Sequence, residues 1–208
     1  VMEYLEGVEL GSVIEREGAL ELARAIRIAQ QMCRALTGAH AAGIIHRDLK
    51  PENVFLTIRD GNADFVKVLD FGIAKVISTT GTGAAFTAIG SVVGTPQYMS
   101  PEQASGLAVD ARSDIYSLGL ILHELIRGKP TFTGDSAVEL MSIQLAKPPP
   151  ALSSPHGPVP RALEQLISQM LQKDPDKRPA SMEAVVAQLE SVASYPTPAS
   201  KTEPLPAM

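Results

Sequence analysis

Three side chains suited to phosphate chemistry lie within six positions of the stretch GIIHRDLKPENVFL, residues 43–56. Asp48 supplies a carboxylate, Lys50 an ammonium and Asn53 a neutral amide oxygen, with apolar residues before and after them. A phosphoryl group that moves to a hydroxyl needs a carboxylate near the hydroxyl proton, and cations near the oxygens that carry the negative charge. The spacing therefore indicates a candidate catalytic turn for phosphoryl transfer.

A second acid, Asp70, occurs in the stretch VLDFGIAK, directly before a Phe-Gly pair. Two β-prone runs, residues 53–58 and 65–69, are separated by the turn-forming residues RDGNAD. A hairpin would bring Asp70 near Asn53 and Asp48. Two carboxylates at that distance repel each other by several kcal/mol unless cations lie between them. Oxygen ligands favour Mg²⁺, and the lack of a Cys or His cluster disfavours zinc.

The elements that must hold this turn are mostly helical. Apolar residues recur at helical spacing over residues 19–42, and Gly43 is a plausible helix stop. Residues 112–127 are apolar on nearly every face, which predicts a buried central helix that ends at Gly128. Further helices are predicted near residues 135–146, 160–172 and 181–193. The stripe in the first helix consists of Leu22, Ile26, Ala29, Cys33, Leu36 and His40.

The pattern predicts a mainly α fold with one small β-hairpin and no alternating βαβ units. Residues 77–95 are rich in Gly, Ser, Thr and Ala and indicate a mobile loop. The opening stretch VMEYLEG is typical of the end of a buried strand. The last residues, 194–208, are Pro-rich and predict a disordered linker or tail.

Composition limits the function classes. The 208 residues are 45% hydrophobic with a net charge of −5 and a pI near 5.4, and no basic run suggests a nucleic-acid partner. No run reaches the roughly 18 apolar residues that span a bilayer. Cys33 is the only cysteine, which excludes an intrachain disulfide, and its place in an apolar stripe favours a buried side chain.

HRDLKPEN at 46–53 with DFG at 70–72 resembles the catalytic loop and metal-binding motif of eukaryotic-type protein kinases. Three further stretches resemble later motifs of that family in the same order: GTPQYMSPEQ at 94–103, SDIYSLG at 113–119 and DPDKRP at 174–179. Lys50 after Asp48, and Thr95 before Pro96, resemble serine/threonine kinases, in a style most similar to bacterial ones.

The resemblance implies ATP and Mg²⁺ as cofactors and a set of roles. Asp48 would orient the acceptor hydroxyl and take its proton, Lys50 would neutralise the phosphate, and Asn53 with Asp70 would bind the metal. Met2 resembles the residue that controls access to the nucleotide pocket. The other nucleotide-binding positions implied are the backbone of Glu3 and Leu5 at adenine, Glu9 at the ribose, Leu10 and Phe55 near the purine, and Glu52. Leu10 and Phe55 are also candidates for the hydrophobic core.

Regulatory and structural roles follow in the same way. Arg47 would pair with a phosphorylated residue, for which Ser91 is the first candidate and Thr87 the second, while Thr95 would bridge to Asp48 and Lys50. For any single hydroxyl of this loop, a polar and unmodified residue is the alternative. The structural positions implied are His46, Phe71 and Asp114 in an internal spine, and Glu102 with Arg178 in a buried ion pair.

The family's small lobe carries a glycine-rich loop, a strand lysine and a helix glutamate, all before the hinge. We expect residues 1–193 to be a partial kinase domain, the hinge and large lobe of a two-lobed α+β parent, which alone transfers phosphate poorly. Its partners would be proteins with Ser or Thr hydroxyls, including a second copy for trans-autophosphorylation, in the cytoplasm. The alternatives are a non-catalytic, pseudokinase-like or truncated binding module, and a small-molecule phosphotransferase, which the GTPQYMSPEQ segment argues against.

Overall fold

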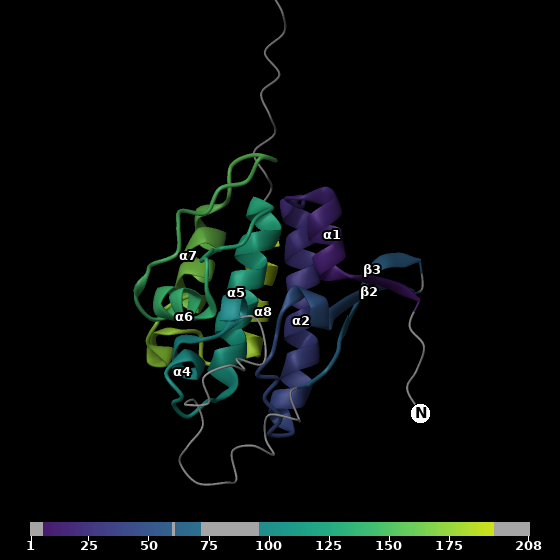
Figure 1. Ribbon diagram of the computed structural model, residues 1–208. Helices are drawn as coiled ribbons and strands as arrows, with labels where there is room; N and C mark the ends of the chain where they lie inside the picture. Colours follow the sequence, from purple (N-terminus) through teal and green to yellow (C-terminus); the bar gives the residue numbers. More distant parts are fainter. Residues whose placement is uncertain (1–5, 60, 72–95, 194–208) are drawn as a thin grey trace, which may run out of the picture.

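The computed structural model describes residues 6–59, 61–71 and 96–193, which are mostly helical with one small sheet at the side of the helices (Figure 1). Two long helices, α2 (Leu22–Ala41) and α5 (Ala111–Arg127), run side by side through the middle. Both were predicted from the sequence, within three residues at each end. The mainly α fold class with a β-hairpin is therefore confirmed.

Helix α2 forms because its apolar residues recur on one face. Ile26, Ala29, Cys33 and Leu36 are buried on that face, as the stripe predicted. The face packs against α5, against α8 (Met182–Ala193) and against the sheet. Burial raises the pKa of the Cys33 thiol to about 12, so Cys33 is a core side chain and not a reactive thiol.

Helix α5 is the centre of the core, because every residue from Ser113 to Ile126 is buried. The Asp110 carboxylate caps its start by accepting the amide of Arg112 at 2.8 Å. Gly128 ends it with φ 72°, and a Cβ there would lie 2.3 Å from the Ala19 nitrogen. Both the left-handed backbone and the close approach of the chain require glycine at this position.

The sheet has the order β1-β2-β3, with all pairs antiparallel. Strands β2 (Val54–Arg59) and β3 (Asn62–Val68) form the predicted hairpin, with Val54 opposite Val68 at its open end. The backbone amide of Leu69 donates to the Asn53 carbonyl at 2.8 Å and extends this pairing by one step. The hairpin therefore joins the catalytic turn to the residues just before Asp70.

Strand β1 (Gly7–Glu9) and helix α1 (Leu10–Glu17) were not predicted. A three-residue strand and an eight-residue helix are too short for a clear periodic pattern, although Leu10, Val13 and Ile14 of α1 are buried. Helix α1 contacts the catalytic turn and β2. Helix α1 therefore supports the catalytic turn where that turn leads into β2.

Helices α6 (Ala137–Ala146) and α7 (Arg161–Met170) lie on the side of α5 that faces away from α2 (Figure 1), and α8 packs against α2 and α7. Helices α6, α7 and α8 agree with the three predicted regions. A four-residue helix, α4 (Pro101–Ala104), packs near α6, and short 3-10 turns lie at η1 (Pro51–Asn53), η2 (Pro96–Tyr98) and η3 (Pro175–Lys177).

Some predictions concern positions outside the described residues. These are the buried strand at the chain start, the mobile loop at 77–95 and the Pro-rich tail at 194–208. In the part of the chain that is described, no helix has the length and apolar character needed to cross a bilayer.

Candidate active site

Asp48, Lys50 and Asn53 lie together on the turn before β2. The Asn53 side-chain nitrogen donates to the Asp48 carbonyl at 2.8 Å and to its carboxylate at 3.3 Å, and Lys50 Nζ lies 3.5 Å from the same carboxylate. Two residues of this turn hold its backbone in place. Leu49 is buried, and Pro51 occupies the first position of η1. Because the Asn53 side-chain nitrogen donates both bonds to Asp48, the side-chain oxygen Oδ1 points away from Asp48 and could bind a metal.

The buried carboxylate of Asp114, near the start of α5, holds the chain just before this turn. It accepts the backbone amides of His46 at 2.8 Å and Arg47 at 3.0 Å. It also contacts the His40 ring Nε2 at 2.7 Å. One side chain of the central helix thus fixes two successive amides of the loop that carries Asp48.

Both nitrogens of the His46 ring are occupied. The Asp48 amide donates to Nδ1 at 3.3 Å, so the ring proton is on Nε2 and is donated to the Leu69 carbonyl at 2.8 Å. The ring also packs against Phe71 with centroids 4.8 Å apart. Through these contacts His46 links the turn, the end of β3 and Phe71.

Arg47 has φ 64°, which is uncommon for a residue other than glycine. Its amide is bound by Asp114 and its carbonyl accepts the side-chain nitrogen of Gln103, on α4, at 2.7 Å. Such backbone strain persists where surrounding contacts fix it, often at functional sites. Among the described residues, no hydrogen-bond partner reaches the buried Nε of Arg47.

Asp70 also has a positive φ, 51°, and its side chain is exposed. The bond from Leu69 to Asn53 brings its backbone next to the turn, as the hairpin predicted. Within the described ranges, no group of three or more His, Cys, Asp or Glu side chains could hold a metal alone. The oxygens of Asn53 and Asp70 suit a magnesium ion that takes other ligands from a nucleotide and water.

The residues expected on the nucleotide side are only partly described. Glu9 on β1 lies opposite Phe55 on β2, and Glu52 on η1 is exposed. Phe55 is half-buried, whereas Leu10 has no exposed surface, so the structure shows Leu10 in the hydrophobic-core role. Met2, Glu3 and Leu5 lie outside the described residues, as do the regulatory positions Thr87, Ser91 and Thr95.

The turn η2 is fixed to α5 by two hydrogen bonds. The Tyr98 hydroxyl donates to the Glu124 carboxylate at 2.6 Å, and the Ser117 hydroxyl donates to the Tyr98 carbonyl at 2.7 Å. Burial raises the pKa of Glu124, and the nearby charge of Glu52 adds to that shift. The segment that follows Thr95 therefore rests on the central helix.

Glu102 and Arg178 form a bidentate ion pair beside this turn, at 2.7 and 2.8 Å. Arg178 also donates to three carbonyls, so each of its five N–H groups has an acceptor; these are the carbonyls of Gln172, Arg112 and Lys173. Burial alone would raise the pKa of Glu102, but the hydrogen bonds from Arg178 and Ser113 hold the pKa below its usual value. The pair remains charged and joins α4 to the end of the domain.

The sequence reading missed two residues that position this site. His40 was interpreted only as part of an apolar stripe, yet it contacts the Asp114 carboxylate. Gln103 was not singled out, although Ser100 three residues earlier forms a capping box with it. The Ser-x-x-Gln spacing before a helix is a signal that could have marked this position.

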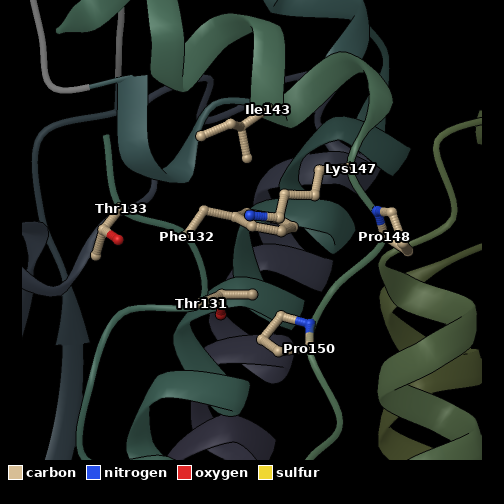
Figure 2. A pocket seen from close by; sticks show the side chains of 7 residues that line it. All are labelled: Thr131, Phe132, Thr133, Ile143, Lys147, Pro148 and Pro150. Atoms are coloured by element: carbon tan, nitrogen blue, oxygen red, sulfur yellow. The ribbon is translucent and has the colours of Figure 1, made fainter. Parts of the chain in front are cut away.

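A cavity of about 150 Å³ lies between the loop that follows α5 and the C-terminal end of α6 with the residues after it (Figure 2). Phe132 and Ile143 line it together with Thr and Pro residues and the side chain of Lys147. None of the residues expected in catalysis lines this cavity.

Comparisons of this chain with protein-family models and with curated proteins agree on one family. Residues 1–189 match the family described as protein kinase domain. The chain is 48% identical over 193 residues to the serine/threonine-protein kinase pkn3 of Myxococcus xanthus, and 44% identical over 178 residues to the serine/threonine-protein kinase PknB of Mycolicibacterium smegmatis. These matches cover 92% and 86% of this chain, but only 35% and 28% of the two relatives. The chain therefore spans about a third or less of the length of these curated relatives.

Proposed function

Because this chain belongs to the protein kinase domain family, we propose that it carries the catalytic loop of a protein serine/threonine kinase. Such an enzyme moves the γ-phosphate of ATP to Ser or Thr hydroxyls of proteins. The observation that carries the proposal is the cluster of Asp48, Lys50 and Asn53 on one loop, held by the buried Asp114. Relatives named as serine/threonine-protein kinases support the substrate class.

In the proposed reaction, Asp48 orients the acceptor hydroxyl and accepts its proton. Lys50 lies close enough to balance the charge of Asp48 and of a phosphate beside it. Asn53, through Oδ1, and Asp70 would hold Mg²⁺, and the bonds from the Asn53 nitrogen to Asp48 orient the amide for this role. Bound ATP and Mg²⁺ supply the phosphoryl group and the positive charge that stabilises its transfer.

We propose further that residues 1–193 form the hinge and large lobe of a two-lobed domain, followed by a linker at 194–208. The helical character of the chain supports this, and so does the lack of a glycine-rich loop with a strand lysine in its sequence. Glu9, Glu52 and Phe55 would face the nucleotide, together with Met2, Glu3 and Leu5. We expect the 208 residues alone to bind ATP weakly, because positioning and charge stabilisation carry most of this reaction.

Regulation would act through Arg47. The backbone of Arg47 is strained, and hydrogen bonds hold both its amide and its carbonyl. Its buried Nε has no hydrogen-bond partner in the described part of the chain. A phosphate on Ser91, or on Thr87, would supply acceptor oxygens to this guanidinium. Thr95 would contact Asp48 and Lys50. A second copy of the protein is the proposed source of that phosphate, and location in the cytoplasm stays a prediction.

The variant Asp48→Asn in the full-length protein tests the proposal. It keeps the backbone carbonyl that Asn53 contacts but cannot accept the hydroxyl proton, so phosphate transfer to a protein should fall by at least about 100-fold. Asp176→Asn is the matched control, because Asp176 is exposed and pairs with Arg112 away from the site. Near-normal transfer by Asp48→Asn, with an unchanged melting temperature, would remove Asp48 from its proposed role.

A further inference from the structure

A chain of three side chains, two of them buried, reaches the turn η2 from a part of the molecule that the proposed reaction does not use. The Lys173 ammonium donates to the Tyr116 hydroxyl at 2.8 Å, and that hydroxyl donates to Gln144 Oε1 at 2.7 Å. The Gln144 nitrogen then donates to the Gln97 carbonyl at 2.6 Å and faces the Pro96 carbonyl at 3.5 Å. We call these three residues, Lys173, Tyr116 and Gln144, the relay.

The relay has a fixed direction. A lysine ammonium can only donate, so the Tyr116 oxygen must accept from Lys173 and give its single proton to Gln144. The Gln144 oxygen is thereby turned to Tyr116, and its nitrogen must face the carbonyls of η2. If the amide turned over, its oxygen would face the Gln97 carbonyl and one buried hydrogen bond would be lost on each side.

Two of the three side chains of the relay are shielded from water, and Lys173 is half-buried. Tyr116 and Gln144 have no exposed surface. The Lys173 ammonium lies 4.9 Å from the centre of the Phe132 ring and 5.3 Å from that of Tyr116. Phe132 is also a wall of the cavity in Figure 2. Burial lowers the pKa of Lys173 to about 8, so it is still largely protonated and a donor at neutral pH.

We propose that the relay positions η2 for the polypeptide substrate, so that Lys173, Tyr116 and Gln144 are positioning residues that set the affinity for the peptide. This rests on the proposed kinase function, in which the segment after Thr95 is the peptide-binding platform. Gln144 holds the carbonyls of Pro96 and Gln97, while Ser117 and Glu124 hold Tyr98. The turn is thus bound on one side by α6 and on the other by α5.

The test begins with Tyr116→Phe in the full-length protein, which removes one oxygen and keeps the ring that packs against Arg178 and Lys173. The Met99 amide donates to the Pro96 carbonyl at 3.2 Å, so its hydrogen exchange reports directly on the turn. We expect its exchange to become about fivefold faster, the factor for one hydrogen bond, with unchanged exchange in the middle of α2. Lys173→Met gives a second variant that breaks the relay from its other end.

Thr131→Val is the matched control. It also removes one buried hydroxyl, which bonds to His123 and takes no part in the relay. Met99 exchange should stay within about twofold of wild type in this variant, since only a general loss of stability could change it. Equal acceleration in Thr131→Val and Tyr116→Phe would overturn the proposal.

Kinetics separate positioning from a structural role. The KM for a peptide substrate should rise about fivefold in Tyr116→Phe, while the KM for ATP and kcat stay unchanged. Faster Met99 exchange with an unchanged peptide KM, or a parallel rise in both KM values, would refute the positioning role. If the wild-type protein transfers no phosphate at all, the proposed function fails, and the exchange measurement still decides whether the relay fixes the turn.

Discussion

The carboxylate of Asp114 accepts the backbone amide of Arg47 at 3.0 Å, although 67 positions separate the two residues. Arg47 has a left-handed backbone and immediately precedes Asp48. The central helix therefore fixes the chain at the point where the catalytic turn begins. This contact explains how a short turn can hold three polar side chains in one arrangement.

Asp114→Asn should destabilise the fold and loosen the catalytic loop. One oxygen of Asp114 accepts from the His46 amide and the other from the Arg47 amide, so either orientation of an asparagine amide places its NH₂ group against a donor. We expect the free energy of unfolding to fall by about 2–3 kcal/mol, measured by urea denaturation. Asp110→Asn is the control and should change it by less than about 1 kcal/mol, because asparagine caps a helix as well as aspartate does and the exposed ion pair with Arg112 contributes little.

Arg178→Lys should be costly even though the charge is kept. Arg178 donates five hydrogen bonds, two of them to Glu102, and a lysine has three donors and no planar fork. Breaking such a buried pair typically costs about 3–5 kcal/mol, and we expect the lower end of that range in a denaturation measurement. Arg34→Lys, in an exposed pair with Glu190, should change stability by less than about 1 kcal/mol. Similar small effects for both variants would contradict this account of the pair.

Stability should depend on pH through His123. This buried ring accepts a hydrogen bond from Thr131 at Nδ1 and donates to the Pro150 carbonyl at Nε2, and burial lowers its pKa to about 4. The unfolded chain binds the proton near pH 6.5, so the contribution of His123 is complete above that pH. It is then lost as the pH falls from 6.5 to 4, by up to about 3 kcal/mol.

The measurement for His123 is the difference between two stability curves, one of wild type and one of His123→Gln, from pH 8 to pH 4. The difference removes the contributions of the acidic residues and of the other histidines. Its slope should approach about 1.4 kcal/mol per pH unit between pH 6 and 4.5. A flat difference would show that the pKa of His123 is the same in the folded and the unfolded protein, which would contradict the predicted shift.

Ser91→Ala should lower the activity of the full-length protein, whereas Ser78→Ala should not. The reason is the buried Arg47 Nε, which lacks a hydrogen-bond partner in the described ranges and would gain one from a phosphate. Mass spectrometry of the active protein, with kinase assays of both variants, is the measurement. Active protein that is unmodified at Ser91 would count against this prediction and would favour Thr87.

The sequence by itself determined the parts of this protein that depend on short-range order. The steps between Ile26, Ala29, Cys33 and Leu36 predicted one buried face of α2, because an α-helix repeats every 3.6 residues. The apolar run of α5 predicted a central helix, and the turn before β3 predicted the hairpin. The spacing of Asp48, Lys50 and Asn53 was also enough to identify the candidate site, since all three lie on one local turn.

Only the tertiary structure decided which distant residues hold that site. His40 and Asp114, Gln103 and the carbonyl of Arg47, and Lys173 and Tyr116 are each separated by 56 or more positions. The packing of helices that are distant in the sequence determines which of these residues form hydrogen bonds, and the local periodicity of the sequence does not contain that information. The short elements β1 and α1 were missed for a related reason, because tertiary contacts with the turn and the sheet stabilise them more than any pattern of their own.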